Sequence, residues 1–356
     1  PERRIPVTVI TGFLGSGKTT LLNNILTKSH GKRIAVIENE YGEIGIDQDL
    51  VAIKKEGGAD DSSTIMMLNN GCLCCSVRDD LIEMLIELST KYRSKFDHII
   101  IETTGMAAVA PIIQAFYADP EVADRVFLDG VVTLVDAKHI IYHLDEGTNT
   151  RPDGVVNEAL DQIAYADRII LNKIDLLGDE KEVSELQDRL RNMNQIAQIV
   201  TTKKSDVSID YVLGVGGFDL DKIEEESREL VDWTDCSDPD CSDPDHHHHH
   251  DHDDHHHHHH HIHVNHDDRV SSISVEMEGN VDYDKIDQWL GILLSEIHVD
   301  LYRMKGILAV EGFDEKYVFQ GVHALFEGKP HELWKEGEER KSKIVFIGRD
   351  LPKERI

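Results

Sequence analysis

A glycine-rich segment directly after the first apolar run constrains the fold more than any other feature of the sequence. Residues 12–19 read Gly-Phe-Leu-Gly-Ser-Gly-Lys-Thr, a complete match to the phosphate-binding pattern G-x-x-x-x-G-K-[ST]. Residues 5–10 predict a strand before this loop, and residues 19–26 predict a helix after it. Glycines let backbone N–H groups turn toward an anion, and the helix N-terminus adds partial positive charge. The segment therefore predicts a nucleotide-phosphate site rather than a surface turn that carries a lysine.

The chemistry of the side chains suggests roles within this loop. Lys18 is expected to reach the β- and γ-phosphates and to assist catalysis, and Thr19 to ligate Mg²⁺. The remaining positions expected to contact phosphate are Gly12, Gly15, Ser16, Gly17 and Thr20.

The rest of the first 205 residues alternates apolar runs with helical patterns. The runs are rich in Val and Ile and almost unbroken, as in strands covered on both faces. They lie at 34–38, 65–68, 98–102, 130–136, 168–172 and 196–200, and helical patterns include 80–92, 155–164 and 181–193. This alternation predicts an α/β fold with a doubly wound, mostly parallel sheet.

The sequence Asn172-Lys173-Ile174-Asp175 suggests the base of the nucleotide. It directly follows a predicted strand, and the Asp175 carboxylate in such a motif accepts from two edge donors of guanine that adenine lacks. The alternative is a helix N-cap at Asp175. With a P-loop in the same domain, GTP is favoured over ATP.

Two carboxylates end other predicted strands. Glu102 closes the run 98–102 ahead of Thr-Thr-Gly105, and it is expected to hold Mg²⁺ through water or to orient the attacking water. Capping of the following helix is the alternative for Glu102. Asp136 ends the run 130–136 and is interpreted as structural, with another carboxylate at the nucleotide edge of the sheet as the alternative.

Three thiols lie within four residues, at Cys72, Cys74 and Cys75. Adjacent cysteines form disulfides poorly, and a following helix N-terminus favours thiolates, which bind soft or borderline cations. Because zinc prefers four ligands, three cysteines leave a position for water, a carboxylate or a histidine. Glu38 and Glu43 are candidate ligands of this metal or of Mg²⁺. A structural or redox role for the thiols and a solvated turn at the glutamates are the alternatives.

Charge is concentrated in one tract. The 356 residues carry 37 Lys and Arg against 68 Asp and Glu, a formal net charge of −31 with His counted as neutral. Such acidity argues against a nucleic-acid partner, which needs a basic surface. Residues 232–268 hold 11 Asp and 15 of the 22 His, and no Lys or Arg. This tract cannot bury a core and is expected to be disordered without metal, acting as a metal reservoir or, alternatively, as a solvated linker.

A second pattern begins at residue 269. A strand at 270–277, a helix at 283–298 and strands at about 301–311, 316–326 and 343–348 predict a small α+β module. His323 is expected to share a strand face with Phe319 and Leu325, as a buried or interface residue. The predicted domains are a P-loop domain at 1–213, an acidic His-rich linker at 214–268 and the α+β domain at 269–356.

All these motifs occur together in the CobW-type metallochaperone GTPases, which the sequence resembles. The family's GCxCC motif is matched at 71–75, its hydrophobic-ExxG strand at 99–105, its NKxD at 172–175 and its NExGE-like segment at 38–43. The resemblance covers residues 5 to about 205, and the module from 269 looks like the family's C-terminal domain. The sequence is most similar to the eukaryotic zinc-regulated branch.

The resemblance implies a GTPase in which the thiolates hold Zn²⁺ near GTP and Mg²⁺, with hydrolysis coupled to release of zinc to a client metalloenzyme such as methionine aminopeptidase. The branch docks on its client through a Cys-Pro motif upstream of the P-loop, a stretch that would precede Pro1, so the client stays open. A nickel or cobalt insertion GTPase and a non-enzymatic zinc buffer or sensor are the alternatives. A homodimer also stays open.

Few features of the sequence bear on the compartment. Five cysteines, three of them clustered, do not form a disulfide framework, which indicates a reducing, cytoplasmic setting. A chain that begins at Pro1 rather than Met indicates a trimmed N-terminus, so an organelle or the nucleus stays open. No run of about 18 apolar residues occurs, so no membrane partner is expected.

Overall fold

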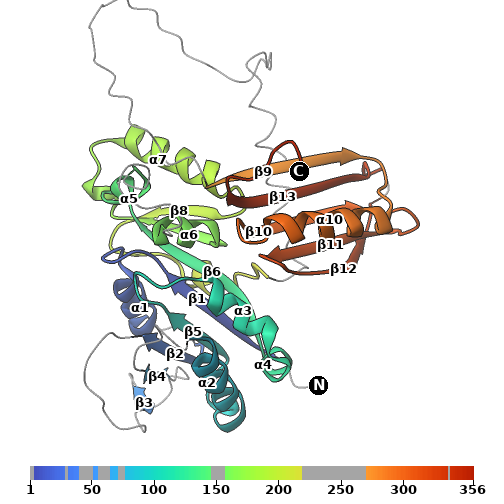
Figure 1. Ribbon diagram of the computed structural model, residues 1–356. Helices are drawn as coiled ribbons and strands as arrows, with labels where there is room; N and C mark the ends of the chain where they lie inside the picture. The colour runs from blue at the N-terminus through green and yellow to red at the C-terminus, as the bar shows by residue number, and fades with distance from the viewer. Residues whose placement is uncertain are drawn as a thin grey trace, which may run out of the picture.

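The chain folds into two domains, each built on one β-sheet (Figure 1). The computed structural model describes residues 4–28, 31–39, 51–54, 65–70, 77–145, 157–218, 270–335 and 337–356. Across this part of the chain, no helix is long and apolar enough to cross a membrane.

The first domain contains an eight-stranded sheet in the order β3-β4-β2-β5-β1-β6-β7-β8. Every neighbouring pair is parallel except β3 and β4, which are antiparallel. The strands are β1 (Ile5–Thr11), β2 (Ile34–Asn39), β3 (Val51–Lys54), β4 (Ile65–Asn70), β5 (His98–Glu102), β6 (Val126–Asp136), β7 (Arg168–Asn172) and β8 (Gln198–Thr202). Chain order changes direction beside β1, so the loop after β1 lies at the switch point where such sheets bind ligands.

Helices cover both faces of this sheet, as their apolar sides require. On one face α2 (Val77–Lys91), α3 (Ala110–Ala118), α6 (Glu158–Ala164) and α7 (Glu180–Met193) pack on alternate strand residues such as Val7 and Ile99. On the other face α1 (Lys18–Thr27) and α8 (Ile209–Val212) cover Ile10 and Ile100. The shorter elements are α4 (Pro120–Arg125), α5 (Ile140–Asp145) and the 3-10 turns η1 (Arg93–Lys95) and η3 (Ile174–Leu176). The predicted doubly wound, mostly parallel fold is confirmed.

The second domain is an antiparallel sheet with one long helix. The strands β9 (Val270–Glu278), β10 (Leu301–Ala309), β11 (Glu315–Val322), β12 (Leu325–Leu333) and β13 (Lys341–Arg349) pair in the order β12-β11-β10-β13-β9. The helix α10 (Tyr283–Ile297) begins at an N-cap, Asp282, that accepts from the Lys285 amide, and it buries Leu290 and Leu294 against Phe346. The predicted α+β module is therefore confirmed.

One predicted strand of this domain is wrong. Residues 316–326 form a hairpin rather than a single strand, because β11 ends at Val322 and β12 starts at Leu325. His323 turns the chain with a φ of 52°, a left-handed conformation that histidine adopts more readily than most residues. It therefore does not share a strand face with Phe319 and Leu325. Its expected place at an interface is confirmed, because its Nε2 lies 2.5 Å from the Tyr165 hydroxyl of the first domain.

Buried polar contacts join the two domains. The Arg303 guanidinium on β10 donates to the Tyr165 carbonyl at 2.9 Å, to the Gly217 carbonyl at 3.0 Å and to the Asp167 carboxylate. Burial raises the pKa of Asp167, but Arg303 and Lys305 outweigh it, so the pKa stays below its ordinary value. Asp167 also accepts from the Val131 amide at 2.8 Å. An ion pair that is fully enclosed in this way makes the domain contact specific and costly to break.

Candidate nucleotide site

The loop after β1 has the geometry that its glycines predict. Gly12, Gly15 and Gly17 have φ values of 141°, 78° and 108°, conformations that side-chain-bearing residues rarely adopt. A Cβ on Gly12 would come within 2.3 Å of the Leu134 carbonyl oxygen, and one on Gly17 within 2.5 Å of Asn172 Nδ2. Gly17 directly precedes α1, so the loop leads into a helix N-terminus. Both β6 and β7, which ends at Asn172, are therefore in close contact with this loop.

Lys18 lies inside the loop. Its Nζ donates to the Gly12 carbonyl at 2.7 Å and to the Phe13 carbonyl at 3.3 Å. Burial lowers the pKa of Lys18 from its ordinary value, and the Glu102 carboxylate raises it in part. Ser16 Oγ is buried without a hydrogen-bond partner among the described residues. An unpartnered buried hydroxyl beside a buried ammonium fits a phosphate oxygen.

Thr19 and Glu102 come together at the carboxyl edge of the sheet. The Thr19 hydroxyl donates to Glu102 Oε1 at 3.2 Å, across 83 residues of sequence. Behind them the Thr103 amide donates to the Ile10 carbonyl at 3.0 Å, which fixes the end of β5 beside β1. A hydroxyl and a carboxylate at this spacing are the oxygen donors that Mg²⁺ prefers, so these residues fit that ion.

The NKxD segment contacts the phosphate loop with two of its side chains. Asn172 Nδ2 donates to the Ser16 carbonyl at 2.9 Å, and Lys173 Nζ donates to the Gly15 carbonyl at 2.7 Å. Lys173 has a φ of 65°, a left-handed conformation that turns the chain out of β7 into η3. Asp175 is exposed to solvent. Asp175 carries the single carboxylate of this four-residue segment, and a ligand can reach it.

Two residues near the NKxD segment, Ser205 and Asn24, were not identified from sequence. Ser205 follows β8, donates its hydroxyl to the Gly17 carbonyl at 3.0 Å and donates its amide to Asn172 Oδ1 at 2.9 Å. Asn24 on α1 donates to the Ser205 carbonyl at 3.0 Å. For Ser205 the sequence offered one signal, which was its position. Polar residues directly after the last strand of a parallel sheet lie at the carboxyl edge of that sheet.

Asp136 belongs to this site as well. Its Oδ2 accepts from Lys173 Nζ at 2.7 Å and from His139 Nδ1 at 3.0 Å, so its contacts reach beyond the structural role expected for it. Burial raises the pKa of Asp136, but the hydrogen bonds from Lys173 and His139 outweigh it and hold the pKa below its ordinary value. Asp136 thus carries charge where the phosphate loop, β6 and β7 meet.

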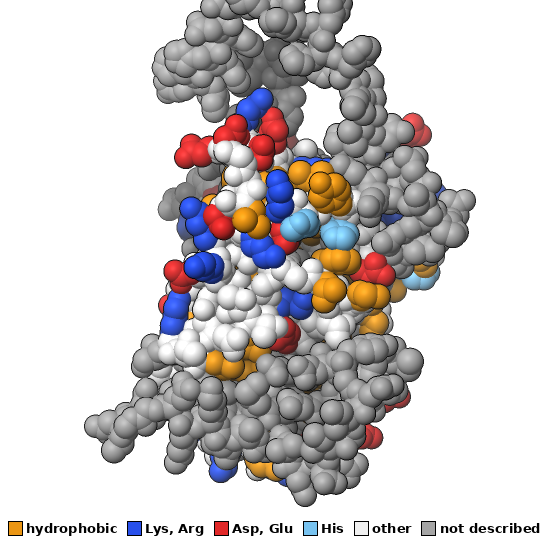
Figure 2. Space-filling model, turned by 90° about the vertical axis from the view of Figure 1, so that its left-hand side faces the viewer, with side chains coloured by type: hydrophobic (Ala, Val, Ile, Leu, Met, Phe, Trp, Pro, Cys, Tyr) orange, Lys and Arg blue, Asp and Glu red, His pale blue; other side chains and the backbone are white. Residues whose placement is uncertain are grey.

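The rim of the site is partly apolar. Figure 2 shows hydrophobic and histidine side chains next to one another on the face where α5 lies. Exposed apolar residues on the loops and helix that surround the site are Leu14, Met106, Ile141 and Tyr142.

The expected metal ligands are placed only in part. Cys72, Cys74, Cys75 and Glu43 lie outside the described residues. Glu38 is the next-to-last residue of β2 and the register partner of Glu102 on β5, so their backbones lie at the same end of the sheet. Within the described ranges, no group of three or more His, Cys, Asp or Glu side chains is arranged to hold a metal ion.

Fold and site together define a P-loop GTPase with a guanine-type base motif. Residues 6–201 match the CobW/HypB/UreG nucleotide-binding domain, and residues 270–356 match the cobalamin synthesis protein CobW C-terminal domain. The chain therefore belongs to the CobW/HypB/UreG family, as its motifs predicted. It hydrolyses GTP, which it binds with Mg²⁺.

Several relatives resemble the whole chain. The zinc chaperone YjiA of Escherichia coli (strain K12) is 34% identical over 99% of this chain and 96% of its own. The zinc-regulated GTPase metalloprotein activator 1 of Saccharomyces cerevisiae is 31% identical over 100% of this chain and 82% of its own. The crystal structure of Zn(II)-bound YjiA GTPase from E. coli superposes with a TM-score of 0.69 at 30% identity, covering 99% and 96% of the two chains.

Proposed function

We propose that this protein is a GTP-hydrolysing zinc metallochaperone that delivers zinc to a client metalloprotein. The observation that carries the proposal is a phosphate loop in contact with Glu102 and the NKxD segment, in a chain that is similar over both domains to proteins named zinc chaperones. The client we would test first is methionine aminopeptidase, which the zinc-regulated branch of the family suggests.

In this proposal the hydrolytic step uses the residues gathered around the loop. Lys18 and the loop amides stabilise the charge on the β- and γ-phosphate oxygens, and Thr19 ligates Mg²⁺. Glu102, hydrogen-bonded to Thr19 at 3.2 Å, orients the attacking water or a water ligand of Mg²⁺. Asn172, Lys173 and Asp175 hold the guanine.

Zinc is the cargo, held by the thiolates of Cys72, Cys74 and Cys75, with Glu38 or Glu43 as the fourth ligand. If zinc binds the GTP state more tightly than the GDP state, thermodynamic linkage requires zinc to tighten GTP binding by the same factor. Loss of the γ-phosphate then lowers the zinc affinity and favours transfer. The His-rich tract at 232–268 supplies zinc to this site.

A competitive zinc titration with a non-hydrolysable GTP analogue or GDP bound tests the coupling. We expect zinc to bind at least fivefold more tightly with the analogue, a coupling of about 1 kcal/mol. The same difference is expected to vanish when the three cysteines are replaced by serine, while GTP hydrolysis persists. Equal zinc affinity in the two nucleotide states would refute the coupling.

A second experiment separates the cargo from the alternatives. Nickel and cobalt are titrated against zinc under the same conditions. We expect the GTP-bound protein to retain zinc in competition with either metal. Preferential retention of nickel would assign the protein to nickel insertion. Absence of GTP turnover in the wild type, with zinc binding intact, would make it a buffer or sensor.

A further inference from the structure

Gln162 on α6 connects the nucleotide site with the inside of the fold. Its side chain is 1% exposed, and its Nε2 donates to the Gly105 carbonyl at 3.1 Å and to the Ala107 carbonyl at 3.5 Å. Both partners are carbonyl oxygens, so only the amide NH₂ group of Gln162 can satisfy them. The contact therefore fixes the orientation of the carboxamide and ties α6 to the turn that follows Glu102.

That turn is pressed against the phosphate loop. A Cβ on Gly105 would lie 2.6 Å from the Leu14 backbone nitrogen, so the two backbones are in direct contact. The Ala107 amide donates to the Thr104 carbonyl at 3.1 Å and closes the turn. Any displacement of Gly105 consequently changes the hydrogen bonds made by Gln162.

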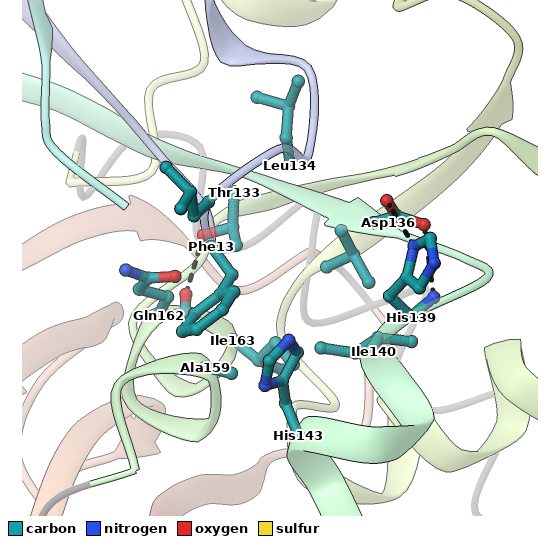
Figure 3. Close-up of a pocket in the computed structure, with 12 residues that line it drawn as sticks. Phe13, Thr133, Leu134, Asp136, His139, Ile140, His143, Ala159, Gln162 and Ile163 are labelled. Atoms are coloured by element: carbon teal, nitrogen blue, oxygen red, sulfur yellow. Dashed lines mark hydrogen bonds and ion pairs between the residues drawn. The ribbon is translucent and has the colours of Figure 1, made fainter. Parts of the chain in front are cut away.

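Gln162 also lines a small cavity beside the phosphate loop, together with Phe13, Leu14 and His143 (Figure 3). The cavity measures about 20 Å³, room for about one water molecule. Gln162 Oε1 is buried and has no hydrogen-bond partner within the described part of the chain. An unpaired buried acceptor costs stability, so the favourable hydrogen bonds of the Gln162 side chain are those that its NH₂ group donates.

The same short helix reaches the second domain. Tyr165, which caps α6, has its hydroxyl 2.5 Å from His323 Nε2, and its carbonyl accepts from Arg303 at 2.9 Å. On the sheet side, the Thr133 hydroxyl donates to the Gln162 carbonyl at 2.7 Å. One helix is thus held by the C-terminal sheet at its end and holds the Gly105 turn at its middle.

We propose that Gln162 is a positioning residue for GTP hydrolysis, which fixes the Gly105 turn against the phosphate loop so that Glu102 meets the γ-phosphate side of the nucleotide. The inference rests on the role proposed above for Glu102. GDP lacks the γ-phosphate, so it makes no contact that requires the position of Glu102. Gln162 therefore contributes to recognition of GTP and to turnover, and not to GDP binding.

Gln162→Met tests the proposal, because methionine keeps the length and volume of the side chain and removes the donor. We expect kcat to fall about tenfold and the preference for a non-hydrolysable GTP analogue over GDP to fall by a similar factor, as expected for one hydrogen bond. The GDP dissociation constant should stay within about twofold. Gln288→Met, an exposed glutamine on α10, is the matched control and should change none of these values.

Hydrogen exchange of the peptide that spans residues 103–109 gives a readout that does not depend on activity. In the wild type, the GTP analogue should slow exchange there relative to GDP, and Gln162→Met should remove that difference even if the variant is less stable. A wild-type peptide that exchanges equally with both nucleotides would overturn the role proposed for the Glu102 turn. A wild-type difference that survives in Gln162→Met, or equal losses of GDP and GTP affinity, would overturn the role of Gln162.

Discussion

The Lys173 ammonium and the Asp136 carboxylate lie 2.7 Å apart, although they are 37 positions apart in the sequence. The same ammonium donates to the Gly15 carbonyl at 2.7 Å. Asp136 therefore orients the lysine of the base motif against the phosphate loop. This arrangement predicts that Asp136 supports nucleotide binding without touching the nucleotide's reacting atoms.

Replacing Asp136 with Asn should weaken GTP and GDP binding equally, by about tenfold, because a charge-assisted hydrogen bond to Lys173 becomes a neutral one. Fluorescent-nucleotide titration measures both constants. Asp206→Asn, which removes an exposed partner of Lys28, is the control and should leave both unchanged. A selective loss of GTP affinity would place Asp136 with the γ-phosphate instead.

Asp175 is expected to determine base specificity, since its exposed carboxylate supplies two acceptors to guanine. Asp175→Asn retains one acceptor, so GTP affinity should fall by about tenfold or more, the loss associated with hydrogen bonds to a charged group. XTP, whose base carries a carbonyl where guanine carries an amino group, should then compete better than in the wild type. Asp188→Asn on the surface of α7 should alter neither nucleotide. Unchanged GTP binding in Asp175→Asn would remove this residue from base recognition.

The ion pair between Arg303 and Asp167 is enclosed between the domains. Arg303→Met removes the cation and leaves Asp167 buried beside Lys305 alone, at 3.4 Å. Unfolding in urea should show a loss of about 3–5 kcal/mol, against at most about 1 kcal/mol for Arg191→Met at a surface pair. A loss for Arg303→Met that is no larger than the loss at the surface pair would contradict a costly unpaired carboxylate at Asp167.

His98 gives stability a pH dependence. Its ring accepts or donates at 2.7 Å to the Thr8 hydroxyl, and burial lowers its pKa from 6.5 to about 4, partly offset by Asp129. The unfolded chain therefore takes up a proton below pH 6.5 that the folded chain does not take up until about pH 4. Stability from this residue is complete above pH 6.5 and is lost as the pH falls, by about 2 kcal/mol between pH 7 and pH 5.

Urea unfolding of wild type and His98→Gln at both pH values isolates that contribution from those of the other histidines. Glutamine keeps a hydrogen-bonding group and does not titrate. The wild type should lose about 2 kcal/mol more than the variant on going to pH 5. Equal losses would mean that His98 is protonated in the folded protein at pH 5.

Local signals made much of the fold predictable. The strand before the phosphate loop, the loop itself and the helix from Lys18 are contiguous in the sequence. A short stretch of sequence was therefore enough to predict all three. Buried parallel strands such as Arg168–Asn172 were found because their central residues form an unbroken apolar run, here Ile169, Ile170 and Leu171. The short strand Val51–Lys54 had no comparable signal and was missed. A helix was expected after Gly105 but without bounds, and the structure places it at Ala110–Ala118.

Pairings across the sheet were not predictable from sequence. The contact of Ser205 with Gly17 spans 188 residues and exists only because β8 and β1 end at the same edge of one sheet. Asp136 looked like an ordinary strand end until β6 and β7 were known to be neighbours. The hairpin at His323 was missed because His323 and Ala324 are not the glycine or asparagine that usually mark such turns.

The chain leaves the first domain at Phe218 and enters the second at Val270, and both residues are buried. Phe218 lies under the Arg303 guanidinium, whose carbon is 4.5 Å from the ring centre, and its carbonyl accepts from Gln320 at 2.8 Å. Ser272, two residues into β9, donates to the Met193 carbonyl at 3.0 Å. Both ends of residues 219–269 are thus anchored at the domain contact. Loop closure costs only about 0.6 kcal/mol for each doubling of loop length. The length and sequence of residues 219–269 can therefore change at little cost to the contacts between the two domains.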